Sequence, residues 1–302
     1  PKQGRCSPDS WYPAIAALKE AKKNAKCPVG LITSLGENMP EKFAKDLIRH
    51  SIIPLTGLEN SLAAVKALQN VSIQWKIKST PSIIWERWPN EKSRVLDEYQ
   101  SKKVLSGIGI NIPKGFIITD KNSLLNKFRT IKKAVVLTAI GINHKTDVSG
   151  VVLGINNENE LLNKFNNMKR LTRSKEFLIE RQVDNCLVEL LIGIVRDPQH
   201  GFMITIAEGG VLSELRKDSV TLCMPCNKTE IARALEKLKI WPLLNGYRNK
   251  KAANINKIIL AIFSLQRYAL EERAKLVELE INPLLVKSNQ VVAADALIRE
   301  NY

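Results

Sequence analysis

The sequence predicts two fold classes in succession, an α/β unit followed by an α+β unit. Residues 28–71 alternate between short apolar runs and helical patterns, which is typical of a βαβα unit with a parallel sheet. From residue 97 onwards the strand patterns outnumber the helical ones, which is typical of mixed strands with helices on one side. Between them, residues 76–96 lose hydrophobic periodicity and collect Pro, Trp and charged side chains, as a linker does.

The first unit contains four elements that follow from local patterns. Apolar runs at 28–33 and 51–56 predict two strands. The segment 39–50 predicts a helix with Pro40 near its start, a position where proline is well tolerated. A second helix is expected at 58–69.

The second unit begins and ends with clear helical patterns. Helices are expected at 97–107 and at 254–270, where Ile and Leu recur at helical spacing. Strands are expected at 115–119, 133–139, 150–155, 176–183, 186–197, 201–210 and 219–224. A helix separates the first two of these strands, and a polar loop separates the second from the third.

The chain ends in a hairpin with an unusual set of polar side chains. Alternate residues of a strand share a face, so Glu278, Glu280 and Asn282 point one way and their apolar neighbours the other. The polar segment 287–290 is typical of a hairpin loop. The hairpin therefore carries one apolar face and one polar face.

Counting outward along this hairpin places an amide opposite a carboxylate. If Val286 pairs with Val291, Asn282 lies opposite Asp295. Directly opposed side chains have Cβ atoms roughly 4.5–5.5 Å apart, close enough to share one cation. Such an oxygen-only pair suits Mg²⁺, completed by water and substrate phosphates. The alternative is a solvent-facing polar side of an edge hairpin, and Pro283 could introduce a bulge that shifts the register.

Composition bounds the class of protein. The chain has 302 residues, enough for two domains, and no apolar run long enough to cross a membrane. The formal net charge of +16 favours polyanionic partners such as nucleotides and coenzyme A. The sequence has no aromatic–basic sheet pattern and no zinc finger, so nucleic acid is not expected as a partner. A membrane is not expected as a partner either, because no long apolar run is present. The basic run 19–26 is typical of a solvated helix face.

The cysteines and the first residues indicate the protein's setting. Five scattered cysteines suit a reducing cytoplasm better than a disulfide framework. Cys223 and Cys226 have CxxC spacing, but no second pair or nearby His completes a zinc site, so a strand end and turn is expected there. The chain begins without Met or a signal-peptide pattern, and we expect it to be the back part of a longer protein.

Several motifs together resemble a known family, the nucleotide-diphosphate-forming acyl-CoA synthetases, such as acetate–CoA ligase (ADP-forming), which are related to succinyl-CoA synthetase. In order along residues 95–302 these motifs are LDEYQSKKVLSGIGINIP, AIGINHKTDVSGVVLG, VELLIGIVRDPQHGF, EGGVLSELRKDSVTL, LLNGYRNKKAANI, ELEINPLLV and VAADALI. Residues 1–75 resemble the tail of the preceding ligase–CoA domain, a Rossmann/flavodoxin-like fold, through PVGLITSLGENMPEKFAKDLI and IIPLTGLENSLAAVKAL.

The resemblance implies a division into domains and an activity. It implies a ligase–CoA-like α/β remnant at 1–75, a linker at 76–96 and an ATP-grasp domain at 97–302. In the family a carboxylate, CoA and ATP become acyl-CoA, ADP and phosphate through a phosphohistidine. ATP or ADP and Mg²⁺ are therefore the expected cofactors and CoA a substrate of the complete enzyme. The expected partners are the CoA-binding and phosphohistidine domains of a full-length chain or partner subunit, without which this chain is expected to be inactive. The resemblance leaves open whether the chain forms a homo-oligomer.

The resemblance also implies roles for individual residues. Asn282 and Asp295 match the family's Mg²⁺ ligands, and Glu280 matches a second acidic residue beside the metal. His144 matches the loop histidine that takes phosphate in some members. A neutral imidazole is a competent nucleophile near pH 7, and Lys145 could neutralise the phosphoryl oxygens it receives.

The nucleotide-binding residues are expected on strands and turns around the same site. Glu180 and Glu189 lie on strands where a carboxylate can accept hydrogen bonds from ribose hydroxyls. Gly209 and Gly210 could let backbone N–H groups approach phosphates, or could simply form a tight turn. Arg248 is a candidate for an anion contact or a structural ion pair.

One departure from the family pattern leaves the function open. The family usually has Lys where this chain has Thr138, and that Lys grips the nucleotide phosphates. A hydroxyl cannot replace this charge-assisted contact, so triphosphate affinity is in question. The first alternative is a degenerate nucleotide-binding or regulatory module without catalysis. The second is a family member that couples CoA-thioester formation to a later step, such as dimethylsulfoniopropionate cleavage.

Overall fold

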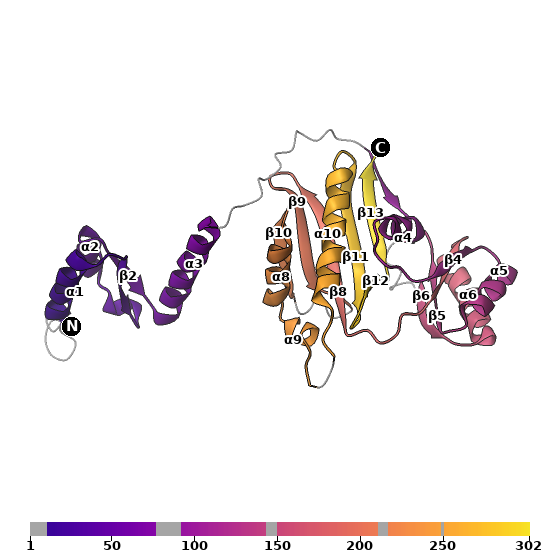
Figure 1. The fold of residues 1–302 in the computed structure, drawn as a ribbon, viewed down its shortest axis with the longest axis horizontal. Coiled ribbons are helices and arrows are strands. Elements are labelled where there is room, and N and C mark those ends of the chain that lie inside the picture. The colour runs from indigo at the N-terminus through magenta and orange to yellow at the C-terminus, as the bar shows by residue number, and fades with distance from the viewer. Residues whose placement is uncertain (1–10, 77–91, 143–149, 211–216, 249–250) are drawn as a thin grey trace. The chain divides into compact units, whose positions relative to one another are not determined.

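The computed structural model describes residues 11–76, 92–142, 150–210, 217–248 and 251–302. The chain divides into two compact units, residues 1–79 and 80–302. Their elements are drawn along the chain in Figure 1. In the described part of the chain, no helix is both long and apolar enough to cross a bilayer.

The first unit is a small α/β unit with a parallel strand pair. Its elements are α1 (Tyr12–Asn24), β1 (Val29–Thr33), the short 3-10 helix η2 (Gly36–Asn38), α2 (Glu41–Arg49), β2 (Ile52–Thr56) and α3 (Leu58–Lys76). Strands β1 and β2 pair in parallel, as the sequence predicted. Ile15, Met39, Phe43, Leu47 and Ile52 form a small core. The mixed α/β class is thus confirmed for this unit.

Helix α3 of the first unit is longer than expected and poorly covered. It continues past residue 69 to Lys76, the first residue of the predicted linker. Its apolar side chains are exposed, including Leu62, Val65 and Leu68, and Trp75 retains 86% of its accessible surface. Parallel sheets are normally covered on both faces, and the described part of the first unit leaves this side of α3 uncovered.

The second unit contains two antiparallel sheets, each with its own core. The small sheet has the order β4-β7-β5-β6 and is covered by two helices. Its elements are β4 (Gly115–Ile118), α5 (Lys121–Ile131), β5 (Val135–Ala139), β6 (Val151–Ile155), α6 (Glu158–Thr172) and β7 (Phe177–Arg181). We call this part the small lobe.

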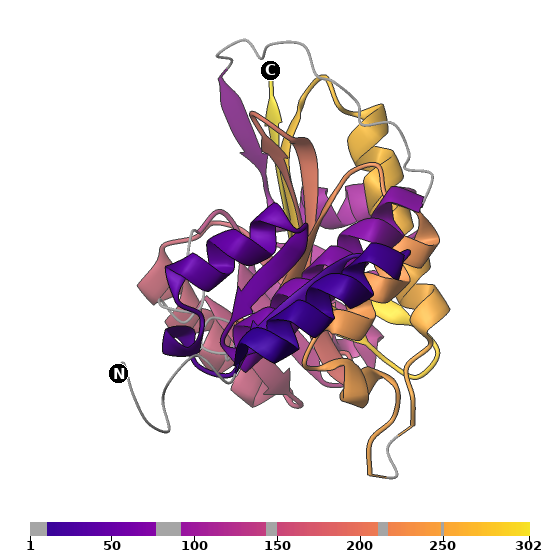
Figure 2. The same cartoon turned by 90° about the vertical axis from the view of Figure 1, so that its left-hand side faces the viewer.

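The large sheet has the order β10-β9-β8-β11-β13-β3, with β12 paired to β11. Its strands are β3 (Ser93–Leu96), β8 (Val188–Asp197), β9 (Gly201–Glu208), β10 (Ser219–Cys223), β11 (Leu276–Val286), β12 (Val291–Ala293) and β13 (Ala296–Asn301). Its helices are α4 (Glu98–Gly107), α8 (Lys228–Lys237), α9 (Trp241–Leu244) and α10 (Ile255–Glu271). In Figures 1 and 2, α8 and α10 lie on the same face of this sheet. We call this part the large lobe.

Strand β3 corrects the sequence analysis. Residues 93–96 were expected to belong to the linker, but they pair with β13 at the edge of the large sheet. Backbone pairing and an ion pair between Arg94 and the buried Glu300, at 2.6 Å, hold the strand in place. A four-residue strand with three exposed side chains has no hydrophobic alternation from which it could have been predicted.

The terminal hairpin has the predicted register. Val286 pairs with Val291, and Ile281 pairs with Ala296 in the same frame. Pro283 does not shift this pairing, although the ladder between β11 and β8 is irregular between Ile281 and Leu284. The predicted alternation also holds, because Leu279 and Ile281 are buried while Glu280 is half-buried on the other face.

Candidate functional site: a strand-end carboxylate beside a buried ion triad

The hairpin brings Asn282 and Asp295 directly opposite one another. The Asn282 N–H donates to the Asp295 carbonyl oxygen at 3.3 Å, and the Ala296 N–H donates to Asp295 Oδ1 at 2.8 Å. Both residues are half-buried. The backbone therefore fixes the amide and the carboxylate at one strand end, the arrangement expected from the sequence.

The donor set at this position suits Mg²⁺ rather than a soft metal. Asn282 and Asp295 supply only oxygen, and Glu280 lies on the same face of β11, two residues before Asn282. Within the described residues, no group of three His, Cys, Asp or Glu side chains converges to hold a metal. A Mg²⁺ site does not need one, because water and substrate phosphates commonly complete its coordination.

Beside this strand end lies a buried group of three charges, which we call the ion triad: Glu98, Lys102 and Glu180. Lys102 Nζ lies 2.6 Å from Glu98 Oε1 and 2.6 Å from Glu180 Oε2. Lys102 is 1% exposed and Glu180 is 4% exposed. Each hydrogen bond joins the Lys102 ammonium to a carboxyl oxygen, and all three side chains are shielded from water. Such charge-assisted hydrogen bonds are strong, and breaking one leaves a buried group without its partner.

The ion triad shifts the pKa values of its members. Burial acts to lower the pKa of Lys102, but the two carboxylates outweigh it and the pKa is raised, so the ammonium stays protonated. Burial raises the pKa of Glu180 to about 7 against the opposing effect of Lys102, and the charges of Glu98 and Asp295 add to the rise. Asp295 therefore lies close enough to Glu180 for their charges to interact.

Thr138 and Glu180 share one face of the small sheet. Val136 on β5 lies opposite Glu180 on β7, and Thr138 lies opposite Leu178. Opposed residues share a face, and so do residues two apart. The other face carries Leu137 and Ile179, which pack under α5 and α6. Thr138 and Glu180 are thus presented together on the face that those helices leave free.

The structure gives Glu180 a partner that the sequence analysis did not foresee. Ribose hydroxyls were the expected partners, whereas Oε2 accepts a hydrogen bond from Lys102. Gly115 pairs with Glu180 across β4 and β7, and a Cβ at Gly115 would lie 2.5 Å from Glu180 Cγ. The glycine therefore makes room for the Glu180 side chain.

Glu189, Gly209 and Gly210 are brought together at a second position. The Gly209 N–H donates to the Glu189 carbonyl oxygen at 2.8 Å, and a Cβ at Gly209 would lie 2.9 Å from the Leu190 carbonyl carbon. Gly210 has φ +86°, and a Cβ there would lie 2.7 Å from Glu189 Oε2. Gly209 is needed for close approach to the β8 backbone and Gly210 for its left-handed φ, so the turn interpretation accounts for both without a ligand.

A pocket of about 280 Å³ opens beside these residues. Its lining includes Glu189, Glu208 and Gly209, with apolar side chains around them. Cys186 also lines it, and burial raises the pKa of its thiol, which disfavours the thiolate. The lining thus combines apolar side chains with carboxylate acceptors, and both kinds of group are used in nucleoside binding.

Among the described residues, Arg248 is the remaining predicted site residue, and its recorded contact lies outside this arrangement. Arg248 follows α9 in a left-handed backbone conformation, with its guanidinium carbon 5.1 Å from the centre of the Tyr247 ring. His144 and Lys145 lie outside the described residues. Their predicted roles stay predictions.

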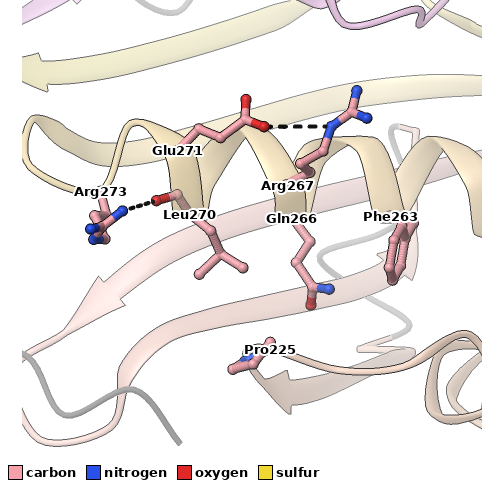
Figure 3. A pocket seen from close by; sticks show the side chains of 7 residues that line it. All are labelled: Pro225, Phe263, Gln266, Arg267, Leu270, Glu271 and Arg273. Atoms are coloured by element: carbon pink, nitrogen blue, oxygen red, sulfur yellow. Dashed lines mark hydrogen bonds and ion pairs between the residues drawn. The ribbon is translucent and has the colours of Figure 1, made fainter. Parts of the chain in front are cut away.

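A larger pocket, about 430 Å³, lies along α10 away from the predicted residues (Figure 3). Its charged groups are already engaged: Arg267 lies 3.8 Å from Glu271, and Arg273 donates to the Leu270 carbonyl oxygen. Gln266 points towards the Pro225 turn and is hydrogen-bonded to Cys226. Size alone therefore does not make this pocket the functional site.

The CxxC segment forms the predicted strand end and turn. Cys223 ends β10, and Cys226 is buried with its backbone N–H donating to Gln266 Oε1 at 2.7 Å. Burial raises the pKa of the Cys226 thiol to about 11. This thiol is therefore a structural group rather than a nucleophile.

Sequence reasoning missed Glu98, Lys102 and Gly115. A signal for Lys102 was present, because Glu98, Ser101, Lys102 and Leu105 fall at helical spacing and are all buried. A lysine on the inward stripe of a helix is unusual unless it is paired. Its partner 78 residues away could not be read from spacing.

Comparisons with known proteins identify the family of the second unit. A family described as an ATP-grasp domain matches residues 87–299. An ADP-forming acetate–CoA ligase of Methanocaldococcus jannaschii is 26% identical over 281 residues, which is 85% of this chain and 40% of that protein. The beta subunit of ADP-forming acetate–CoA ligase I of Pyrococcus furiosus is 27% identical over 214 residues, 68% of this chain and 91% of the subunit.

A solved structure shares the fold. It is an acetyl-coenzyme A synthetase of Ca. Korarchaeum cryptofilum, in complex with coenzyme A and Mg-AMPPCP and with its phosphohistidine segment pointing towards the nucleotide binding site. The TM-score is 0.57 at 27% identity, over 67% of this chain and 90% of that one. With the family match covering most of the chain, the protein belongs to the ATP-grasp family, in the group that includes the ADP-forming acyl-CoA synthetases.

Proposed function

We propose that this chain binds Mg²⁺ and an adenine nucleotide and transfers phosphate between ATP and a histidine. This transfer is one step on the way from a carboxylate and CoA to acyl-CoA, ADP and phosphate. The observation that carries the proposal is the opposed pair of Asn282 and Asp295, whose donors suit the metal of a nucleotide phosphate. The matched relatives are ADP-forming CoA ligases, and one solved relative holds Mg-AMPPCP.

In the proposed site each residue has a defined task. Asn282 and Asp295 would hold the metal through oxygen atoms, and Glu280, on the same face of β11, would hold water beside it. Bound Mg²⁺ supplies charge that neutralises the nucleotide phosphates during transfer. Glu189 and the pocket beside Gly209 hold the nucleoside. The family lysine at position 138 is absent, so the ammonium that would contact the phosphates is missing at this position.

The transfer itself needs a nucleophile that is uncharged near pH 7. An imidazole nitrogen of His144 attacks the terminal phosphorus of ATP, the bond to the β-phosphate oxygen breaks, and ADP leaves. The imidazole loses its proton once the N–P bond forms. Lys145 is placed next in sequence to neutralise the transferred oxygens.

The complete reaction also requires parts that hold CoA and the acyl group. The chain spans 40% of the single-chain relative's length, so we assign those tasks to further domains or to a partner subunit. The exposed apolar side chains of α3 suit contact with such a partner. Holding reactants in place can be worth roughly 7–11 kcal/mol of barrier. The 302 residues on their own are therefore expected to form no thioester.

Incubating the chain with Mg²⁺ and ATP labelled in the terminal phosphate is expected to give a slow, acid-labile and base-stable label, without acyl-CoA when carboxylate and CoA are added. The label should disappear in His144→Ala and persist in His200→Ala, whose exposed imidazole is paired with Asp197. Absence of any label in the unmodified chain would contradict phosphate transfer and favour a nucleotide-binding module without catalysis.

Thr138→Lys is expected to tighten ATP binding more than ADP binding, because an added ammonium on the face shared with Glu180 would reach the phosphates. The unmodified chain should prefer ADP or bind both nucleotides weakly. Calorimetric titration with each nucleotide measures the difference, and Thr138→Met controls for the change in side-chain length. Tight ATP binding before the substitution, with no gain after it, would show that the missing lysine is unimportant.

A further inference from the structure

The two lobes of the second unit have separate apolar cores. Leu105 and Ile110, in and just after α4, pack with the core of the large sheet. Ile179 on β7 packs with the core of the small sheet under α5 and α6. Helix α4 thus belongs to the large lobe, and the strand that carries Glu180 belongs to the small lobe.

Lys102 connects these two lobes through a buried ionic contact. It projects from α4 and lies 2.6 Å from Glu180 on β7, while Glu98, one turn earlier on α4, holds the same ammonium. The large-lobe strand end is tied to the same region, because the Ala293 N–H donates to the Asn111 carbonyl oxygen at 2.8 Å. The contact between Lys102 and Glu180 therefore joins the large lobe, which carries Asp295, to the small lobe, which carries Thr138.

Burying this contact costs desolvation free energy, and the local structure makes room for it. Three ionisable groups are buried, and each would be expensive to bury alone. Gly115 lacks the Cβ that would displace Glu180. Replacing such a group with packed apolar side chains is often neutral or stabilising, so stability alone does not explain its presence.

We propose that Lys102 is a positioning residue that fixes the separation of the two lobes across the nucleotide site. The proposal rests on the proposed function, because that site is where Mg²⁺ and nucleotide would contact both lobes. While Lys102 contacts Glu180, the small-sheet face that carries Thr138 is held at a fixed distance from the strand end that carries Asp295. Without it, each lobe keeps its own core, and the lobes sample a range of separations.

Spin labels can measure this separation directly. Asn166→Cys on α6 and Asn256→Cys on α10 place one label on each lobe, at exposed positions. The background carries serine at Cys6, Cys27, Cys186 and Cys223, which leaves the buried Cys226 unlabelled. Pulsed electron spin resonance on the 302-residue chain should give one narrow distance distribution.

Lys102→Met is expected to broaden or shift this distribution and to weaken Mg–ADP binding, because the groups that would contact the nucleotide from the two lobes are no longer held at one separation. The control is Lys103→Met, because Lys103 is the exposed neighbour on the same helix. It should change neither measurement. If Lys102→Met fails to fold, Glu180→Gln, measured at pH 8 where the Glu180 carboxyl of the parent is ionised, removes the charge with little change of shape and should also broaden the distribution.

A charge swap separates positioning from plain structural support. Lys102→Glu with Glu180→Lys recreates the contact in reverse and should restore the narrow distribution that each single change loses. A folded Lys102→Met or Glu180→Gln variant with the parent's distribution would overturn the proposal. If the parent binds no Mg–ADP, the proposed function fails while the distance measurement still decides the role of Lys102.

Discussion

Glu180→Gln is expected to flatten the pH dependence of unfolding between about pH 4.5 and pH 7. Burial raises the pKa of Glu180 from its ordinary value of 4.5 to about 7. Between these values the folded protein holds a proton that the unfolded chain has lost. The contribution of Glu180 to the free energy of unfolding is therefore fully present below pH 4.5 and is lost as the pH rises through about 7.

Urea denaturation followed by circular dichroism at a series of pH values measures this effect. In the Glu180→Gln variant, the free energy of unfolding should change less with pH, because a glutamine side chain does not titrate in this range. Glu176→Gln is a matched control, since Glu176 is exposed and lies just before β7. Parallel pH profiles for the parent and Glu180→Gln would contradict the raised pKa.

The hairpin shows what the sequence can specify on its own. The alternation of apolar and polar residues in β11 fixed which side chains face the core, and a short polar loop fixed the pairing frame. Because a slip by one residue would move Leu279 and Ile281 out of the core, the register was predictable. The position of Asn282 opposite Asp295 followed from that count.

The ion triad shows where sequence reasoning stops. Helical spacing placed Lys102 on the inward face of α4, but spacing does not reveal a partner on another sheet. Glu180 was recognised as part of the site, whereas its contact depends on how two separately packed lobes meet. The lack of a Cβ at Gly115 matters only once β4 and β7 are paired.

The edge strand β3 and the end of α3 were missed for a different reason. Both lie next to residues rich in Trp, Pro and charge, where local patterns are typical of a linker. Backbone pairing with β13 stabilises β3 from outside the segment itself. Tertiary context therefore overrode local preference in β3.

The central claim is that Asn282 and Asp295 hold the Mg²⁺ of a bound adenine nucleotide. The measurement that tests it most directly is a calorimetric titration of ADP, with Mg²⁺ and with a chelator, into the parent chain and Asp295→Ala. Glu278→Ala is the control, because Glu278 lies on the same face of β11 but is paired with Arg299 at 3.1 Å.

The parent should bind ADP more tightly with Mg²⁺ than with the chelator. Asp295→Ala should lose this metal-dependent gain, by at least about tenfold in affinity, since even groups that only support a metal ligand contribute that much. Glu278→Ala should keep it. A metal-dependent gain of the same size in Asp295→Ala and in the parent would contradict the claim.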